Sequence, residues 1–553
     1  MMDSRPWLKN YPEGIPANIK VDTYPSLREF IQESFTKFSN LKAFTLMGQS
    51  LTYKELDEKS NAFAAYLQYR GLKPGDRIAL MMPNLLQYPI AIFGAIRAGV
   101  IVVNTNPLYT PREMEFVFTN ADVKAIVIVE NFASNLEKIL AKTKIEIVIL
   151  TTIGELLGGF KGAVVDFMVK YIKRLVPKYK LINTVNFTTA LRQGAKQSLK
   201  PVSIKSEDIA LLQYTGGTTG ISKGAMLTHR NLVANVEQIK AVICYYLEER
   251  KETTLSPLPM YHIFAFAVNV MAMMAIGANT VLILNARDCG SIIKAFRKHP
   301  ISLMTGVNTL FNAIMQHPGF SKIDFSSLKV TVGGGMAVQS AVAEKWKSLT
   351  GCWLCEGYGM TEASPVISIN PIDGKGKTGS IGMPVPSTDV RIVDDYGRIC
   401  GIQEAGEIQV KGPQVMLGYL NRPDETAKTI VDGWLCTGDI GMMDEDGFFK
   451  IVDRKKDMII VSGFKVFPAE IEDLISRHPK VLEAAAIGVP DEKSGEAVKL
   501  FIVKKDKSLT ESEVHEYCKE NLTNYKIPKS IEFRDALPKT NIGKILRREL
   551  RQI

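Results

Sequence analysis

The sequence is poor in cysteine, and its cysteines do not have the spacing of a disulfide framework or a zinc site. The 553 residues contain seven cysteines, an odd and scattered set, in which Cys352 and Cys355 form a single CxxC. A structural zinc ion takes four ligands, so this pair alone does not predict a metal site. Scattered thiols are typical of a reducing compartment, and we expect a cytoplasmic protein.

Signal-peptide and low-complexity segments are also lacking. The first residues, MMDSRPWLKNYPEGIP, have no basic stretch followed by an apolar one, so we expect no secretory signal. No repeat period is visible. A composition of 46% hydrophobic and 23% charged residues excludes a disordered chain and predicts ordered domains.

One uncharged run, residues 263–284 (IFAFAVNVMAMMAIGANTVLIL), is long enough to cross a bilayer. It contains Asn269, Gly277, Asn279 and Thr280, and it ends in the strand-like TVLIL. We therefore predict a core helix, a turn at Gly277 and a buried strand, with a membrane span as the alternative.

The chain is basic, with a net charge of +10 and a pI of about 9.0, which suits an acidic partner. No basic stripe with interleaved aromatics supports nucleic acid as that partner. Residues 160–180 hold six basic residues and one acidic residue, and a helix there would gather Phe167, Met168, Tyr171, Ile172 and Val176 on one face. Two interpretations stay open: a solvated surface helix, or peripheral docking on an anionic membrane at the inner face.

Strand-like and helix-like segments alternate along the chain, which predicts α/β layers around buried parallel strands. Residues 76–82, 101–107, 125–129 and 145–151 read as strands, and an apolar helix lies at 87–99. Near Glu404 short strands with glycine-rich turns begin. We predict a large region over 1–452, a charged linker over 453–457 and a small α+β domain over 458–553.

The segment YTGGTTGISKG, residues 214–224, combines four glycines with hydroxylated residues and Lys223. Glycine lets backbone N–H groups approach phosphate oxygens, and the lysine supplies a positive charge. The Walker, kinase and Rossmann spacings are not met. The segment alone predicts a phosphate loop, with a flexible surface loop as the alternative.

This loop resembles that of the adenylate-forming superfamily of acyl-CoA synthetases, luciferases and peptide-synthetase adenylation domains. Four further segments fit the family in order: YGMTE (358–362), WLCTGD (434–439), DRKKDMIIVSGFKVFPAEIE (453–472) and PKTNIGK (538–544). The resemblance is greatest to bacterial long-chain fatty-acid–CoA ligases. It implies a two-step reaction with ATP, Mg²⁺ and CoA, and a mobile C-terminal domain.

The resemblance also assigns roles to residues. It places the ATP phosphates on the loop, Mg²⁺ on Thr218 and Glu362, the α-phosphate on Thr361, and adenine on two segments with Tyr358 stacked on the base. The loop and adenine residues are Tyr214, Thr215, Gly216, Gly217, Thr218, Thr219, Gly220 and Lys223, with Gly333, Gly334, Gly335, Glu356, Gly357 and Tyr358. Without the motif, Glu362 would be read as a surface carboxylate.

The remaining implied roles concern ribose, the lysine of adenylation, the hinge and the acyl chain. Asp439 suits the ribose hydroxyls with help from Arg454, for which a surface salt bridge is the alternative. Lys544 would bridge the acyl carboxylate and the α-phosphate. The hinge is at Lys456, the CoA-facing loop is Ser462, Gly463 and Phe464, and the acyl site includes His262, Phe266 and Gly334.

The acyl pocket and several rival functions stay open at this point. We expect His262 to position substrate, with a buried core histidine as the alternative, and Phe266 stands where some relatives have an aromatic gate. Rivals are a ligase for medium-chain or aryl acids, an acyl-AMP ligase with another acceptor, and a noncatalytic nucleotide-regulated membrane-binding protein. Whether the chain forms a homodimer is also open.

Overall fold

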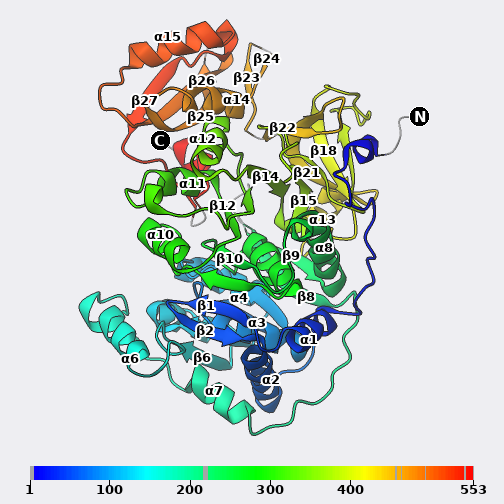
Figure 1. Cartoon of the computed structure of the whole chain (residues 1–553), viewed down its shortest axis with the longest axis vertical. Helices are drawn as coiled ribbons and strands as arrows, with labels where there is room; N and C mark the ends of the chain where they lie inside the picture. Colours follow the sequence, from blue (N-terminus) through cyan, green and yellow to red (C-terminus); the bar gives the residue numbers. More distant parts are fainter. Residues whose placement is uncertain are drawn as a thin grey trace.

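The computed structural model describes residues 5–215, 222–454, 457–462, 464–491, 494–540 and 543–551. Figure 1 shows two parts: a large body built of the segments up to β22, and a smaller C-terminal part, drawn in orange and red, at one end of it. Helices and strands alternate through both parts. The predicted α/β class, with a large N-terminal region and a smaller C-terminal unit, is confirmed.

The first sheet of the body carries the glycine-rich loop. Its strands lie in the order β19-β9-β8-β4-β3-β5-β6-β7. The strands from β8 to β7 pair in parallel and are largely buried, whereas β9 and β19 run antiparallel. Their bounds are β3 Arg77–Met81, β4 Ile101–Asn104, β5 Ala125–Val129, β6 Ile147–Thr151, β7 Thr184–Asn186, β8 Ile209–Thr215, β9 Lys223–Thr228 and β19 Gly418–Tyr419.

The second sheet runs in the order β16-β15-β14-β13-β12-β10-β11-β1-β2. Two of its strands carry predicted site residues: β13 ends at Gly333 and β14 ends at Gly359. Its bounds are β1 Lys42–Leu46, β2 Gln49–Thr52, β10 Thr253–Ser256, β11 Asn279–Leu282, β12 Leu303–Gly306, β13 Val330–Gly333, β14 Leu354–Gly359, β15 Val366–Ile369 and β16 Met383–Pro384.

The apolar run at 263–284 folds as predicted, into a buried helix, a turn and a strand. Its helix is a π-helix, η6 (Ala265–Ala272), continued by α9 (Met273–Ala275), and Gly277 turns the chain with φ +69° into β11. Every residue of η6 is buried. In the described residues no helix is both long and apolar enough to cross a bilayer.

The body's helices cover these two sheets. Helix α2 packs against α3 and α7, α8 packs against η6, and α11 packs against α12. Their bounds are α1 Leu27–Lys37, α2 Tyr53–Tyr69, α3 Gln87–Arg97, α4 Pro111–Asn120, α5 Ala133–Glu137, α6 Gly159–Phe167, α7 Phe187–Gly194, α8 His229–Val242, α10 Cys289–Lys298, α11 Asn308–Met315, α12 Ser340–Thr350 and α13 Pro423–Thr429.

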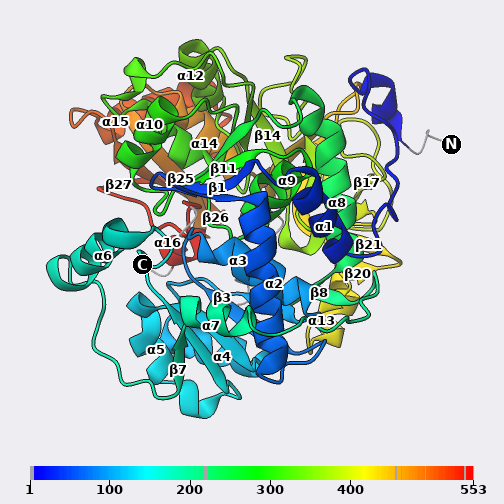
Figure 2. The same cartoon turned by 60° about the horizontal axis from the view of Figure 1, so that its bottom comes forward.

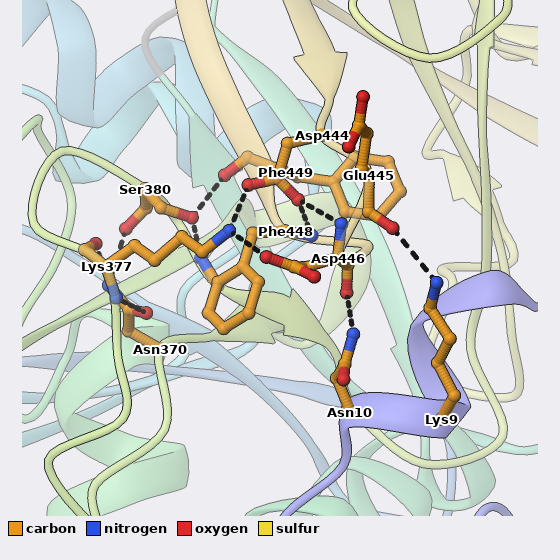
Figure 3. A network of polar contacts seen from close by, with 11 residues as sticks. Lys9, Asn10, Asn370, Lys377, Ser380, Asp444, Glu445, Asp446, Phe448 and Phe449 are labelled. Carbon is orange, nitrogen blue, oxygen red and sulfur yellow. Dashed lines mark hydrogen bonds and ion pairs between the residues drawn. The ribbon is translucent and has the colours of Figure 1, made fainter.

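A third sheet leads from the body to the C-terminal part. It is formed by β17 (Asp389–Val393), β18 (Gly406–Lys411), β20 (Ile430–Val431), β21 (Trp434–Met443) and β22 (Phe449–Arg454). The turn between β21 and β22 is held from two sides, as Figure 3 shows: Lys377 Nζ binds Asp444 at 2.5 Å and Asp446 at 2.8 Å, and Asn10 donates to the Asp446 carbonyl at 2.6 Å. These contacts anchor β21 and β22 at the turn that joins them.

The C-terminal part is a sheet with helices. Its strands are β23 Ile459–Val461, β24 Phe464–Val466, β25 Val481–Asp491, β26 Gly495–Lys504 and β27 Ser530–Arg534, and its helices are α14 Pro468–Ser476, α15 Glu511–Asn521 and α16 Arg547–Arg551. Helix α15 begins with a capping box, because Thr510 accepts from the Glu513 backbone and Glu513 accepts from the Thr510 backbone.

Candidate active site

The predicted phosphate loop begins and ends on adjacent antiparallel strands. β8 ends at Thr215, β9 begins at Lys223, and these two residues pair across the ladder. Tyr214, one residue earlier, is buried and donates its hydroxyl to Asn120 of α4 at 2.6 Å, which anchors the strand. The loop residues that lie outside the described residues are Gly216, Gly217, Thr218, Thr219 and Gly220.

Lys223 makes two contacts at the end of this loop. Its ammonium pairs with Glu425 of α13 and lies 5.1 Å from the centre of the Tyr419 ring. The side chain of Lys223 is 19% exposed and that of Glu425 is 34% exposed. The ammonium is therefore paired with an acidic residue that solvent can reach.

Glu362 lies in a short 3₁₀ turn, η8 (Thr361–Ala363), directly after Thr361. It is buried, and its Oε1 accepts a hydrogen bond from the Tyr419 hydroxyl at 2.7 Å. A Mg²⁺ ion that travels with ATP needs one or two carboxylates, with phosphate and water as the other ligands. Glu362 is a buried carboxylate linked through Tyr419 to Lys223, so it fits that requirement and could hold the ion.

The residues of the predicted adenine wall lie on or directly after the adjacent parallel strands β13 and β14. Gly333 pairs with Glu356 across these strands, and Gly334 and Gly335 follow. A Cβ at Gly334 would lie 3.1 Å from both the Gly357 carbonyl oxygen and the ring of Phe264. A side chain at Gly334 would therefore crowd the Gly357 backbone and the Phe264 ring.

Glu356 is a buried carboxyl in this wall. It accepts a hydrogen bond from the Val338 backbone at 3.1 Å. Burial, opposed by the Val338 hydrogen bond and aided by the charge of Asp473 in α14, raises the pKa of Glu356 to about 8. The group is therefore mostly protonated at neutral pH.

Tyr358, Asp439 and Arg454 come together at the end of β14 and across β21 and β22. The Tyr358 hydroxyl donates to Asp439 Oδ2 at 2.7 Å. Asp439 and Arg454 are directly paired in the antiparallel ladder of β21 and β22. The predicted base-stacking residue and the predicted ribose residue are therefore neighbours.

His262 and Lys544 are brought together from the two parts of the chain. Burial and, to a smaller extent, the charge of Lys544 lower the pKa of His262 to about 4. The imidazole is neutral at physiological pH, and its Nδ1 accepts from the Phe264 backbone at 3.3 Å. A neutral, weakly basic imidazole suits substrate positioning better than proton abstraction.

Phe266 lies one turn after His262 in the buried start of η6. Its backbone N–H donates to the His262 carbonyl at 3.0 Å, and its side chain is part of the main core. Another aromatic, Phe264, lies against Gly334. Phe264 is thus a second candidate for the acyl-pocket aromatic, and its signal in the sequence is only its position two residues after His262.

The predicted CoA-facing residues lie at the β23–β24 turn of the C-terminal part. Ser462 has φ +50°, and its backbone N–H donates to the Ser494 carbonyl at 2.8 Å. The ring of Phe464 is 56% exposed and stacks on Tyr525 with centroids 4.8 Å apart. Gly463 and the predicted hinge residue Lys456 lie outside the described residues.

A cluster of opposite charges surrounds the predicted linker. Arg547 of α16 lies 3.7 Å from Asp453, 3.2 Å from Asp457 and 2.7 Å from Glu472. Asp453 also accepts from the Ala469 backbone at 3.0 Å. The last turn of the chain is therefore tied to both ends of the linker.

Three residues in or beside this site have no signal in the sequence. Tyr419 and Glu425 reach Glu362 and Lys223 from a distant segment, and Thr309 of α11 donates to the carbonyl of Gly543, beside Lys544, at 3.2 Å. None belongs to a quoted motif, and no local spacing links them to their partners.

The comparisons with known proteins agree with this geometry. A family model described as AMP-binding enzyme matches residues 31–420, and one described as AMP-binding enzyme C-terminal domain matches residues 470–544. The chain therefore belongs to the AMP-binding enzyme family, which confirms the resemblance drawn from the motifs.

Individual relatives are similar over their whole length. A long-chain-fatty-acid–CoA ligase of Salmonella typhimurium is 55% identical over 99% of this chain and 97% of the relative. One of Bacillus subtilis is 39% identical over 100% of this chain and 98% of the relative. The crystal structure of an anthranilate CoA ligase with anthranoyl-AMP shares the fold, with a TM-score of 0.86, 24% identity, and 97% and 98% coverage.

Proposed function

We propose that this protein is an AMP-forming long-chain-fatty-acid–CoA ligase that uses ATP, Mg²⁺ and CoA. The observation that carries the proposal is the 55% identity to such a ligase over 99% of the chain. Two sets of contacts support it: Tyr419 contacts both Glu362 and Lys223, and Lys544 interacts with His262, which is hydrogen-bonded to the Phe264 backbone.

The first half-reaction joins two anions. A fatty-acid carboxylate oxygen attacks the α-phosphorus of ATP, the bond to pyrophosphate breaks, and acyl-AMP forms. The carboxylate is already a nucleophile, so positive charge and positioning supply the catalysis. In this scheme Lys223 binds the outer phosphates, Thr361 and Lys544 bind the α-phosphate, and His262 positions the carboxylate. Mg²⁺ held by Glu362 would add charge neutralisation.

The second half-reaction replaces AMP with CoA. The CoA sulfur attacks the acyl carbon, and the bond to AMP breaks. The scheme requires Lys544 to leave and Ser462, Gly463 and Phe464 to enter, by rotation at Lys456. Part of the Arg547 cluster would open in that rotation, because Asp453 precedes the hinge whereas Arg547 and Glu472 follow it.

Two related functions remain as alternatives: a ligase for medium-chain or aryl acids, and an acyl-AMP ligase with another acceptor. The test is release of AMP and pyrophosphate from ATP and Mg²⁺ with acids from C4 to C18 and benzoate, with and without CoA. We expect CoA-dependent turnover that peaks at long chains. A peak at short or aryl acids, or release indifferent to CoA, would select one of the alternatives.

We also propose that the α6 surface binds an anionic membrane. Helix α6 continues as a π-helix, η4 (Met168–Ile172), and Figures 1 and 2 show α6 at the edge of the molecule. The exposed apolar residues here include Phe160, 86% exposed, with Phe167 and Tyr171 in ring contact at 5.3 Å. The predicted helical face from Phe167 to Val176 is too long, because the helix ends at Ile172, before Val176.

The charges on this surface support an anionic partner. All six basic residues of 160–180 are exposed: Lys161, Lys170, Lys173, Arg174, Lys178 and Lys180. The single acidic residue, Asp166, turns inward and accepts from Thr152 and the Gly154 backbone, both at 2.7 Å. The outer face thus combines aromatic rings with positive charge, as interfacial helices do.

Vesicle binding tests the membrane proposal. We expect sedimentation with phosphatidylglycerol vesicles at low salt, release at high salt, and weaker binding of the pair Phe167→Ser and Tyr171→Ser. Phosphatidylcholine vesicles are the control for charge. Absence of sedimentation with anionic vesicles at low salt would contradict the proposal and leave α6 as a solvated surface helix.

A further inference from the structure

Tyr419 is held rigidly between the phosphate loop and α13. It lies in β19, where it pairs with Ala225 of β9, two residues after Lys223. Its backbone N–H donates to the Thr426 hydroxyl at 2.9 Å. The residue is 7% exposed, so its ring has little freedom to move.

The side chain of Tyr419 contacts two groups of opposite charge. Its hydroxyl donates to Glu362 Oε1 at 2.7 Å, and the Lys223 ammonium lies 5.1 Å from its ring centre. A hydrogen bond to an ionised carboxylate is stronger than one between neutral groups. An ammonium over an aromatic face is attracted by the electrons of the ring.

We propose that Tyr419 is a positioning residue that sets the place of Glu362 relative to Lys223. The proposal rests on the proposed function, in which both groups act on the same triphosphate. The phenol contacts each group in a different way: Glu362 accepts a hydrogen bond from its hydroxyl, and the Lys223 ammonium, which also pairs with Glu425, lies by its ring. Tyr419 thereby links the buried carboxylate to the lysine while each keeps its own polar partner.

The two contacts can be separated by two substitutions. Tyr419→Phe removes the hydroxyl and keeps the ring, whereas Tyr419→Leu removes both. The readout is ATP binding by calorimetry without fatty acid, so that no turnover occurs, once with Mg²⁺ and once with EDTA. The ratio of the two Kd values measures how much Mg²⁺ strengthens ATP binding.

We expect Tyr419→Phe to reduce this Mg²⁺-dependent gain about tenfold, since it removes a hydrogen bond to a charged group. Its Kd in EDTA should stay at the wild-type value. Tyr419→Leu should in addition raise the Kd in EDTA about two- to fivefold, through loss of the cation–π contact. The matched control is Tyr53→Phe, which removes a buried hydroxyl that donates to the Ala278 carbonyl at 2.8 Å.

The outcomes separate this inference from the proposed function. The positioning role is wrong if Mg²⁺ strengthens ATP binding in Tyr419→Phe as much as in the wild type. It is also wrong if Tyr419→Phe weakens ATP binding equally with Mg²⁺ and with EDTA. An equal loss in Tyr53→Phe would also overturn it, because the effect would then be one of general stability. Failure of the wild type to make acyl-CoA from any acid would instead refute the proposed ligase function. The ATP-binding measurements would still test the role of Tyr419, because they do not depend on turnover.

Discussion

The hydroxyl of Thr309 donates a hydrogen bond of 3.2 Å to the carbonyl oxygen of Gly543. Thr309 belongs to α11 of the body, and Gly543 is the residue before Lys544. A second contact joins the same two parts, because Asp473 accepts from the Ser340 backbone at 3.3 Å. The C-terminal part is therefore in contact with the body directly beside Lys544.

Lys544→Ala should separate the two half-reactions. Loss of one well-placed charged donor costs about 3–4 kcal/mol in a transition state, or about a hundred- to a thousandfold in rate. We expect that loss in pyrophosphate release, with conversion of supplied acyl-AMP to acyl-CoA retained. Lys529→Ala, which removes an exposed lysine paired with Asp491, is the control. Equal losses in both half-reactions would contradict this role.

Gly543→Ala should weaken the docked arrangement without removing a charge. Gly543 has φ +85°, and a Cβ there would lie 2.6 Å from the Thr309 hydroxyl. Positive φ costs a residue with a side chain about 1–2 kcal/mol, so we expect acyl-AMP formation to fall about tenfold and thiolation of supplied acyl-AMP to persist. Adding Thr309→Ala should restore part of the rate; no restoration would mean that the clash is not the cause.

Glu356→Gln should abolish the rise in the KM for ATP that we expect for the wild type at alkaline pH. Burial raises the pKa of Glu356 from its usual 4.5 to about 8, so the folded state keeps a proton that the unfolded state loses, and stability falls as pH rises from 4.5 to 8. Above pH 8 the new negative charge repels ATP, and we expect the KM for ATP to rise about tenfold. The KM of Glu356→Gln should stay flat from pH 7 to 9; a rise equal to that of wild type would refute the assignment.

His229→Asn should reduce acid sensitivity. His229 is buried, its Nδ1 accepts from the Leu27 backbone at 3.3 Å, and burial lowers its pKa from 6.5 to about 4. Its folded state binds fewer protons than its unfolded state, so stability is lost as pH falls from 6.5 toward 4. At pH 5.5 the loss is about 1.4 kcal/mol. Thermal unfolding of wild type and His229→Asn from pH 7.5 to 5 measures it, and parallel Tm curves would exclude the effect.

Glu425→Gln should strengthen ATP binding. ATP phosphates must take the Lys223 ammonium from Glu425 in the proposed scheme. Exposed ion pairs are weak, so we expect the KM for ATP to fall only about two- to fivefold. Asp424→Asn, on the same helix, removes the same charge without touching Lys223 and should change the KM less. A KM that rises in Glu425→Gln would show that this carboxylate helps to hold the nucleotide.

Much of the fold could be predicted from local patterns. Period and composition predicted β5 and the helix α3, because these depend on residues close in sequence. The turn at Gly277 could be predicted because it separates two apolar segments of different character. The end of the α6 helix before Val176 was missed, since the apolar pattern continues past the point where Arg174 adopts φ +51°.

The motifs predict which residues belong to the candidate site, but they do not predict which of these residues contact one another. The sequence marks Lys223, Glu362 and Lys544, but it does not show that Tyr419 contacts the first two or that Lys544 lies near His262. Such contacts join segments from different sheets and from the two parts of the chain. They follow from tertiary packing, for which a single sequence carries no local signal.

The stack of Phe464 on Tyr525 has a spectroscopic consequence. The four tryptophans of the chain, Trp7, Trp346, Trp353 and Trp434, all precede residue 458, so intrinsic tryptophan emission comes from the body alone. A tryptophan placed at position 464 would be the first emitter in the C-terminal part, on a ring surface that is 56% exposed. In a variant whose native tryptophans are replaced by phenylalanine, a shift of its emission to shorter wavelength on addition of CoA would report the proposed rotation in real time.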